Sequence, residues 1–149
     1  MIYYEDIDVG TVRTGGSYTI ERDEILEFGR RFDPQPFHTD EEAARRSPFG
    51  GLVASGWHTA SICMRLMVEA NLGPGGSSLG SPGADEIRWL VPVRPGDILS
   101  VRTEVIAKRP LNSRPDRGLV TIRATLANQD GIDVMTMVGL GFFARREAG

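Results

Sequence analysis

The chain has 149 residues, of which 40% are hydrophobic and 25% charged, and its formal net charge is −3 at pH 7. This length fits one domain with its own hydrophobic core, so we expect residues 1–149 to form a single domain. The small negative charge, together with the absence of any run of more than two Lys or Arg residues, argues against a nucleic-acid-binding surface.

The N-terminal part of the chain indicates where the protein resides. Residues 1–8 are acidic and lack the basic-then-apolar pattern of a secretory signal. No apolar run approaches the roughly 20 residues that a membrane-spanning helix needs. The one cysteine, Cys63, excludes an internal disulfide and lies in an apolar stretch, where a buried side chain is expected. We therefore expect a cytoplasmic protein with no membrane partner.

A strand and a short helix are predicted for the first part of the chain. Residues 12–20 have the pattern of a strand, which two consecutive glycines weaken. Residues 21–32 combine a polar helix start with apolar side chains at helical spacing. This helix should end near Phe32, because Pro34 and Pro36 disfavour helical backbone in the residues before them.

A second short helix and a long buried helix should follow. Thr39 is a good N-cap, and Glu42 stands at the capping-box spacing for a helix through Arg46. Residues 52–72 are apolar on nearly every helical face, which is typical of a helix in the middle of a domain. Residues 71–83 are rich in Gly, Ser and Pro, and this composition predicts a flexible connecting loop.

The second half of the chain predicts strands joined by short turns. The expected strands are residues 86–90, 98–108, 119–127 and 134–144. One face of the second of these strands should carry Leu99, Val101, Thr103, Val105 and Ala107. Asp130-Gly131 predicts a tight hairpin before the last strand. A long helix followed by strands indicates the α+β class, with an antiparallel sheet curling around the central helix.

A loop braced by prolines carries one of the two histidines of the chain. His38 follows Asp33 by five positions, and the rigidity of the loop suits a site that must hold its side chains in place. A histidine and a carboxylate at one site can activate a water molecule, since one accepts its proton while the other donates or orients. The residues alone leave open the alternative of an aspartate that caps a turn beside an exposed histidine.

A glycine-rich stretch, residues 50–57, leads into the buried helix. Backbone N–H groups at a helix N-terminus lack partners, and the helix dipole favours negative charge there. Gly56 would let a ligand approach the backbone closely, so this stretch is a candidate oxyanion hole for a thioester enolate. A plain helix cap by Ser55 is the alternative. His58, on the first turn, is interpreted as a packing or supporting contact and not as the base.

Neither a metal nor a cofactor is expected. The sequence has no dinucleotide fingerprint and no P-loop. His38, with Asp40 and Glu41 nearby, lacks the helical histidine spacing of zinc sites, and Cys63 has no cysteine partner. Four methionines are predicted to fill the core: Met64, Met67, Met135 and Met137.

Three blocks of the sequence resemble MaoC-like dehydratases, the (R)-specific enoyl-CoA hydratases with a hotdog fold. Residues 32–38 (FDPQPFH), followed by two alanines, resemble the family pattern D-x-N-P-(apolar)-H. Residues 51–56 resemble the glycine-ending turn that opens the central helix of that fold. Residues 87–93, with Gly96-Asp97, resemble the next strand and turn. The blocks occur in the family's order and cover most of the chain.

This resemblance implies a hydro-lyase, an enoyl-CoA hydratase or dehydratase of fatty acid metabolism. Asp33 and His38 would hold one water molecule between them. His38 would activate this water for attack on C3 of a trans-2-enoyl thioester, and Asp33 would take part in delivering a proton to C2. The product of this syn hydration would be an (R)-3-hydroxyacyl thioester, and dehydration is the reverse.

The resemblance also implies a substrate site and a partner. The Gly56 N–H would polarise the thioester carbonyl, while Ser55, Gln35 and Trp57 would lie at the substrate. The substrate would be an acyl-CoA or an acyl-carrier thioester. The acyl tunnel would lie between two subunits, so the resemblance implies a homodimer or a larger oligomer of dimers.

Several positions depart from the family pattern. Gln35 stands where Asn is usual, Ser55 where many relatives have His, and Met64 where some carry a serine, for which Ser61 is the nearby substitute. The acyl group therefore stays open, as do two alternative functions. One is an acyl-CoA thioesterase, which would need a carboxylate on the central helix. Glu69 is the only acidic residue on that helix, and it lies far from the helix start. The other is a non-catalytic acyl-binding subunit.

Overall fold

The computed structural model describes residues 1–71 and 76–147. Within these residues, five strands form one antiparallel sheet in the order β1-β3-β4-β5-β2. The strands are β1 (Val12–Thr19), β2 (Ala84–Trp89), β3 (Ile98–Pro110), β4 (Arg117–Ala127) and β5 (Asp133–Ala144). The helices are η1 (Tyr4–Asp6), α1 (Arg22–Phe32), α2 (Pro36–Thr39), α3 (Glu41–Arg46) and α4 (Gly56–Asn71). None of them is long and apolar enough to cross a membrane.

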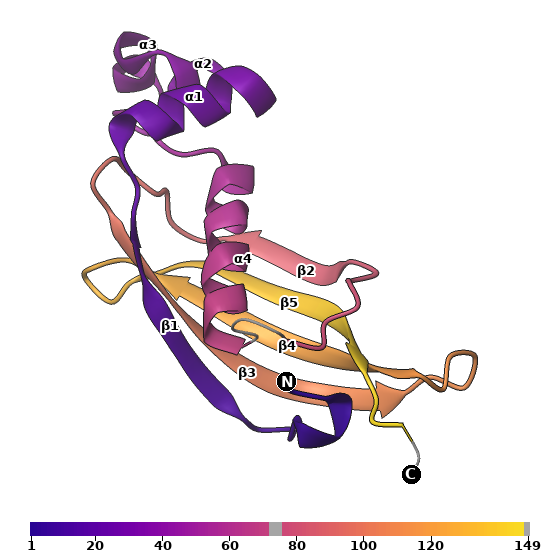
Figure 1. Cartoon of the computed structure of the whole chain (residues 1–149). Helices are drawn as coiled ribbons and strands as arrows, with labels where there is room; N and C mark the ends of the chain where they lie inside the picture. The colour runs from indigo at the N-terminus through magenta and orange to yellow at the C-terminus, as the bar shows by residue number, and fades with distance from the viewer. Residues whose placement is uncertain (72–75, 148–149) are drawn as a thin grey trace.

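The sheet curves around α4, which runs along its inner face, while α1, α2 and α3 gather beyond the N-terminal end of α4 (Figure 1). This is the α+β arrangement that the sequence predicts. The core between helix and sheet includes Ile62, Cys63 and Leu66 from α4, and Leu99, Val101, Ala124, Leu126 and Met135 from the strands. The predicted face of β3 is buried from Leu99 to Val105, but Ala107 is exposed. A register shift between Val105 and Ala107 breaks the alternation there.

The central helix begins four residues later than the sequence predicts. Residues 52–55 are extended instead: the Val53 N–H donates to the Phe37 carbonyl at 3.2 Å, and the Ala54 N–H donates to the Val93 carbonyl at 2.9 Å. A short apolar run is compatible with either a buried strand or a buried helix, so the periodicity could not place this boundary. The predicted end at Leu72 lies outside the described residues, as does part of the predicted loop. In the described part of that loop, the Leu79 N–H donates to the Phe142 carbonyl of β5 at 2.8 Å.

One face of α4 is open to solvent, which corrects the prediction of a helix buried on nearly all sides. Besides the Arg65 and Glu69 pair, the exposed positions are Trp57, Ser61, Met64 and Val68. These four recur at helical spacing and form one stripe. Of the four methionines predicted as core, Met64 is therefore exposed, and the other three are buried.

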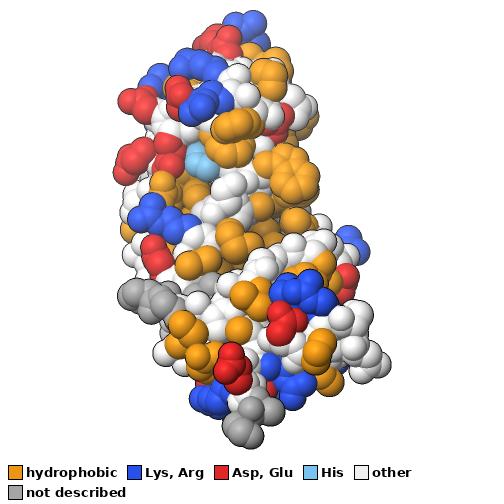
Figure 2. Space-filling model, turned by 45° about the vertical axis from the view of Figure 1, so that its right-hand side comes forward, with side chains coloured by type: hydrophobic (Ala, Val, Ile, Leu, Met, Phe, Trp, Pro, Cys, Tyr) orange, Lys and Arg blue, Asp and Glu red, His pale blue; other side chains and the backbone are white. Residues whose placement is uncertain are grey.

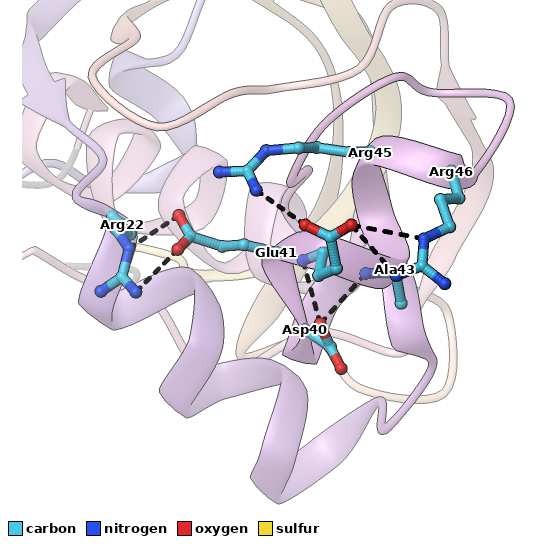
Figure 3. A network of polar contacts seen from close by, with 7 residues as sticks. Arg22, Asp40, Glu41, Ala43, Arg45 and Arg46 are labelled. Carbon is cyan, nitrogen blue, oxygen red and sulfur yellow. Dashed lines mark hydrogen bonds and ion pairs between the residues drawn. The ribbon is translucent and has the colours of Figure 1, made fainter.

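Polar contacts cap α3 and join it to α1 (Figure 3). Asp40, and not the predicted Thr39, caps α3: its carboxylate accepts from the N–H groups of Glu42 at 2.9 Å and Ala43 at 3.0 Å. Pro36 starts the one-turn helix α2, which includes Thr39 and so moves the cap by one residue. The Arg22 guanidinium donates two hydrogen bonds to Glu41, at 2.7 and 2.8 Å, and these tie α1 to α3.

Candidate active site

The end of α1 and the short helix α2 bring Asp33 and His38 together. Asp33 is the C-cap of α1, with its N–H donating to the Gly29 carbonyl at 2.9 Å, and His38 lies in α2. A Cβ on Gly29 would lie 2.8 Å from the His38 carbonyl oxygen and 2.9 Å from its Cβ. Only a glycine therefore allows the last turn of α1 to pack this closely on α2. No local pattern singles out Gly29, because this contact joins two elements of the tertiary structure.

The His38 ring is held in one tautomer. The residue is 5% exposed, and its Nδ1 lies 2.7 Å from the Val53 carbonyl oxygen. A carbonyl only accepts, so Nδ1 carries the proton, and Nε2 of the neutral ring is left with a lone pair. Nε2 lies 3.2 Å from Asp33 Oδ2. The neutral ring can therefore act as a base at Nε2, and once it is protonated there it can pass the proton to the Asp33 carboxylate.

Two further side chains donate to the Asp33 carboxylate. The Ser55 hydroxyl donates to Oδ2 and the Gln35 amide donates to Oδ1, both at 2.7 Å. Burial raises the pKa of Asp33, but the hydrogen bonds from Ser55 and Gln35, together with the attraction of a protonated His38, outweigh it, so the pKa lies below its ordinary value. Asp33 is therefore a carboxylate at neutral pH. Gln35, in place of the usual Asn, still reaches this carboxylate.

Ser55 caps the central helix, which is the alternative that the sequence left open for it, and it also contacts Asp33. Its Oγ donates to Asp33 and also accepts from the Trp57 N–H at 3.3 Å, so it caps α4 and orients the carboxylate. The Ser55 side chain is fully buried behind Asp33. It therefore contacts the acidic residue and is shielded from a ligand.

Gly56 lies against the indole ring of Trp89, which no sequence pattern marks as part of the site. A Cβ on Gly56 would lie 2.5 Å from Trp89 Cε2, so the indole of Trp89 packs directly on the Gly56 backbone. Trp57 meets the same indole edge to face, with ring centroids 5.2 Å apart. The sequence indicated that Gly56 allows a close approach; the structure shows that part of this approach is made by Trp89. Trp89 closes a predicted strand, and nothing local links it to Gly56.

A cavity of about 530 Å³ opens over these residues. Its lining includes Asp33, Gln35, His38, Gly56, Trp57 and Trp89. Most of the remaining lining is apolar, from Phe37 and Phe49 and from the segment Leu90–Val93. Figure 2 shows a histidine at the surface with hydrophobic side chains around and below it. An apolar cavity with a few convergent polar groups is the usual form of a small-molecule site.

The second histidine lies behind this cavity and does not line it. His58 Nε2 is 3.4 Å from Glu24 Oε2, which also accepts from the Tyr18 hydroxyl at 2.6 Å. The ring stacks on Phe28 with centroids 4.6 Å apart. Burial lowers the pKa of His58, and the nearby Glu24 carboxylate only partly opposes this effect. His58 is thus a packed, neutral side chain that joins α4 to α1.

Comparisons with known proteins agree with this geometry. The family described as the MaoC like domain matches residues 9–128. The structure of a MaoC-like dehydratase from Rhodospirillum rubrum is 44% identical, covers 99% of this chain and 100% of its own, and superposes with a TM-score of 0.90. A 3-hydroxybutyryl-CoA dehydratase of Methylorubrum extorquens is 30% identical over 76% of this chain and 70% of its own. The uncharacterized protein YdeM of Bacillus subtilis is 31% identical over 87% and 90%. The chain therefore belongs to the MaoC-like dehydratase family and has its hotdog fold.

Proposed function

We propose that this protein is a hydro-lyase that adds water reversibly to a trans-2-enoyl thioester of coenzyme A or an acyl carrier, giving the (R)-3-hydroxyacyl thioester. The observation that carries this proposal is the contact of His38 Nε2 with Asp33 Oδ2 at 3.2 Å on the wall of an apolar cavity. A base of fixed tautomer beside an ionised carboxylate is suited to activating water. Membership of the dehydratase family supports the same reaction class.

In the proposed reaction, the Asp33–His38 pair carries one proton from the attacking water molecule to C2 of the substrate. His38 Nε2 accepts a proton from a water molecule while the water oxygen bonds to C3 of the enoyl group. The electron pair of the double bond moves through C2 onto the thioester oxygen. Collapse of this enolate takes a proton at C2 from the pair, by way of the Asp33 carboxyl, which the 3.2 Å contact allows His38 to protonate. The pair returns to its starting state, and both additions occur on one face of the substrate.

The enolate needs a donor, and we assign this role to the Gly56 N–H. It begins α4, so it has no acceptor within the helix, and the helix dipole favours negative charge at this end. Removal of one oxyanion donor typically lowers kcat by about 10²–10³-fold in other enzymes. Gly56 lines the same cavity as Asp33 and His38, which supports their acting on one substrate.

We further propose that the protein is a homodimer or an oligomer of dimers. The exposed stripe of α4 carries Trp57, Met64 and Val68, and β2 forms an edge of the sheet with Trp89 exposed at its end. An exposed apolar patch beside an unpaired sheet edge is typical of a subunit interface. Light scattering at micromolar concentration should give the mass of at least two chains, and a monomer would contradict this proposal.

The direct test is hydration of crotonyl-CoA and longer trans-2-enoyl-CoAs, followed by loss of the conjugated thioester absorbance. We expect turnover by the wild-type protein and loss of most of it in Asp33→Asn. Asp23→Asn is the matched control, because that carboxylate is exposed on α1. Release of free CoA would favour a thioesterase instead. Against that reading, Glu69 is exposed and lies 3.1 Å from Arg65, and it is absent from the lining of the cavity.

A further inference from the structure

The two tryptophans of the chain lie in contact on one side of the active-site cavity. Trp57 is on the first turn of α4 and Trp89 is the last residue of β2. Their rings meet at an interplanar angle of 77°, and the residues remain 58% and 45% exposed. This aromatic pair therefore spans from the helix to the sheet edge and is accessible to a ligand.

The position of Trp89 is fixed by Gly56. A Cβ at Gly56 would lie 2.5, 2.8 and 2.9 Å from three atoms of the indole, which shows that the ring occupies the space where a side chain would be. Trp89 therefore borders the backbone N–H to which we assign the thioester carbonyl. An acyl group whose carbonyl reaches Gly56 must lie beside this indole.

A second cleft, of about 460 Å³, lies further along the same two elements. Its lining is mostly apolar and includes Met64, Met67 and Val68 of α4, Ala84 of β2, and Met137 and Phe143 of β5. It shares no lining residue with the active-site cavity. Within one chain, an acyl chain longer than the first cavity would be buried by continuing into this cleft.

The aromatic pair stands on the side of the active-site cavity that faces the cleft. Along β2, Ala84 lines the cleft, while Trp89 is the only residue of the strand that lines the active-site cavity. Along the exposed stripe of α4, Trp57 comes first, and Met64 and Val68 follow on later turns. Both elements thus place a tryptophan between the Asp33–His38 pair and the apolar cleft.

We infer that the Trp57–Trp89 pair is a wall that ends the acyl site, and that the substrates of this protein are short-chain enoyl thioesters. This inference rests on the proposed hydratase function. One extra methylene in an apolar pocket changes kcat/KM by about tenfold or more, so a wall at this place would dominate chain-length selection. Removal of the Trp89 ring should extend the cavity in the direction of the cleft and admit longer chains.

The test compares kcat/KM for crotonyl-CoA and trans-2-dodecenoyl-CoA. Wild-type protein should prefer the short substrate, and Trp89→Ala should raise the dodecenoyl-to-crotonyl ratio by about tenfold or more. Trp89→Phe keeps an aromatic ring and should keep the wild-type order of preference. If a thermal unfolding measurement shows that Trp89→Ala does not fold, Trp57→Ala is the second variant. It removes the other, more exposed half of the wall and should shift the ratio in the same direction.

Two outcomes would overturn the inference: a wild-type protein that prefers the long substrate, or an unchanged ratio in a folded wall variant. A binding measurement keeps it separate from the proposed function. Because both tryptophans line the cavity, their fluorescence reports on occupancy by saturated butyryl-CoA and dodecanoyl-CoA. If no enoyl-CoA is hydrated, the proposed function fails. The inference about the wall is then supported if butyryl-CoA changes the tryptophan emission at a lower concentration than dodecanoyl-CoA does, and if Trp89→Phe retains this order. The inference is contradicted if the order is reversed or if neither ligand binds.

Discussion

The two histidines of this protein form a natural comparison. Each is 5% exposed, and each directs Nε2 at a carboxylate oxygen, at 3.2 Å from Asp33 for His38 and at 3.4 Å from Glu24 for His58. By residue type and burial the two pairs are alike. They differ in surroundings: Asp33 and His38 line the cavity of about 530 Å³, whereas Glu24 and His58 do not.

The hydrogen bond at the other ring nitrogen separates them further. His38 Nδ1 donates to the Val53 carbonyl, which leaves Nε2 as a base. His58 Nδ1 is buried with no partner in the described part of the chain, so its proton belongs on Nε2, where it meets Glu24. The tautomers are therefore opposite. One pair can accept a proton from a ligand, while the other fastens α4 to α1.

The largest expected effect on activity appears when each histidine is replaced separately by glutamine. His38→Gln should lower kcat/KM for crotonyl-CoA by about 10²–10⁴-fold, the usual contribution of general acid–base catalysis. His58→Gln should change it by less than about tenfold, because its ring does not reach the cavity. Circular dichroism confirms that both variants fold. An equal loss of activity in the two folded variants would contradict the different roles that we give to His38 and His58.

The next largest effect is expected from a substitution of Gly29, which packs against His38. In Gly29→Ala the new Cβ would meet the His38 backbone at 2.8 Å, and the backbone cannot yield as a flexible side chain would. We expect the free energy of unfolding to fall by about 1–3 kcal/mol and kcat/KM to fall by about 10²-fold as His38 is displaced from Asp33. Urea unfolding and the hydration assay measure both.

Gly16→Ala is the matched control for this change. A Cβ on Gly16 would have no heavy atom within 4 Å. The control should therefore keep wild-type activity and stability. Wild-type activity in Gly29→Ala would show that the α1–α2 contact does not position His38.

The histidine pairs also show how much the sequence could predict. Asp33 and His38 could be selected as the candidate pair because prolines and a family pattern mark their loop, and the buried face of β3 could be predicted from its alternation. The start of α4 was misplaced, because residues 52–55 are as apolar as the helix that follows. The packing of Trp89 on Gly56 has no local signal, since the two residues belong to distant segments. Contacts between elements were thus the part that the sequence did not reveal.

A smaller effect is expected from Ser55→Ala, which acts on Asp33 without touching His38. Loss of the hydroxyl donor should raise the pKa of Asp33, so the acid limb of the kcat/KM profile should move to higher pH. Loss of the α4 cap should lower the free energy of unfolding by about 1 kcal/mol. Ser61→Ala, an exposed serine further along α4, should shift neither quantity. An unmoved acid limb in Ser55→Ala would exclude Asp33 as the titrating group.

The smallest effect concerns stability alone and tests whether His58 is neutral. Its pKa is lowered in the folded protein by burial, so the unfolded chain binds a proton near pH 6.5 that the folded chain does not. Stability should therefore decline as the pH falls from about 6.5 toward the lowered value. His58→Phe keeps the stacking on Phe28 and should flatten this decline in urea midpoints measured at several pH values. Tyr18→Phe, which removes a donor to Glu24 but no histidine, should retain it. A decline of equal slope in His58→Phe would mean that His58 is not the group responsible.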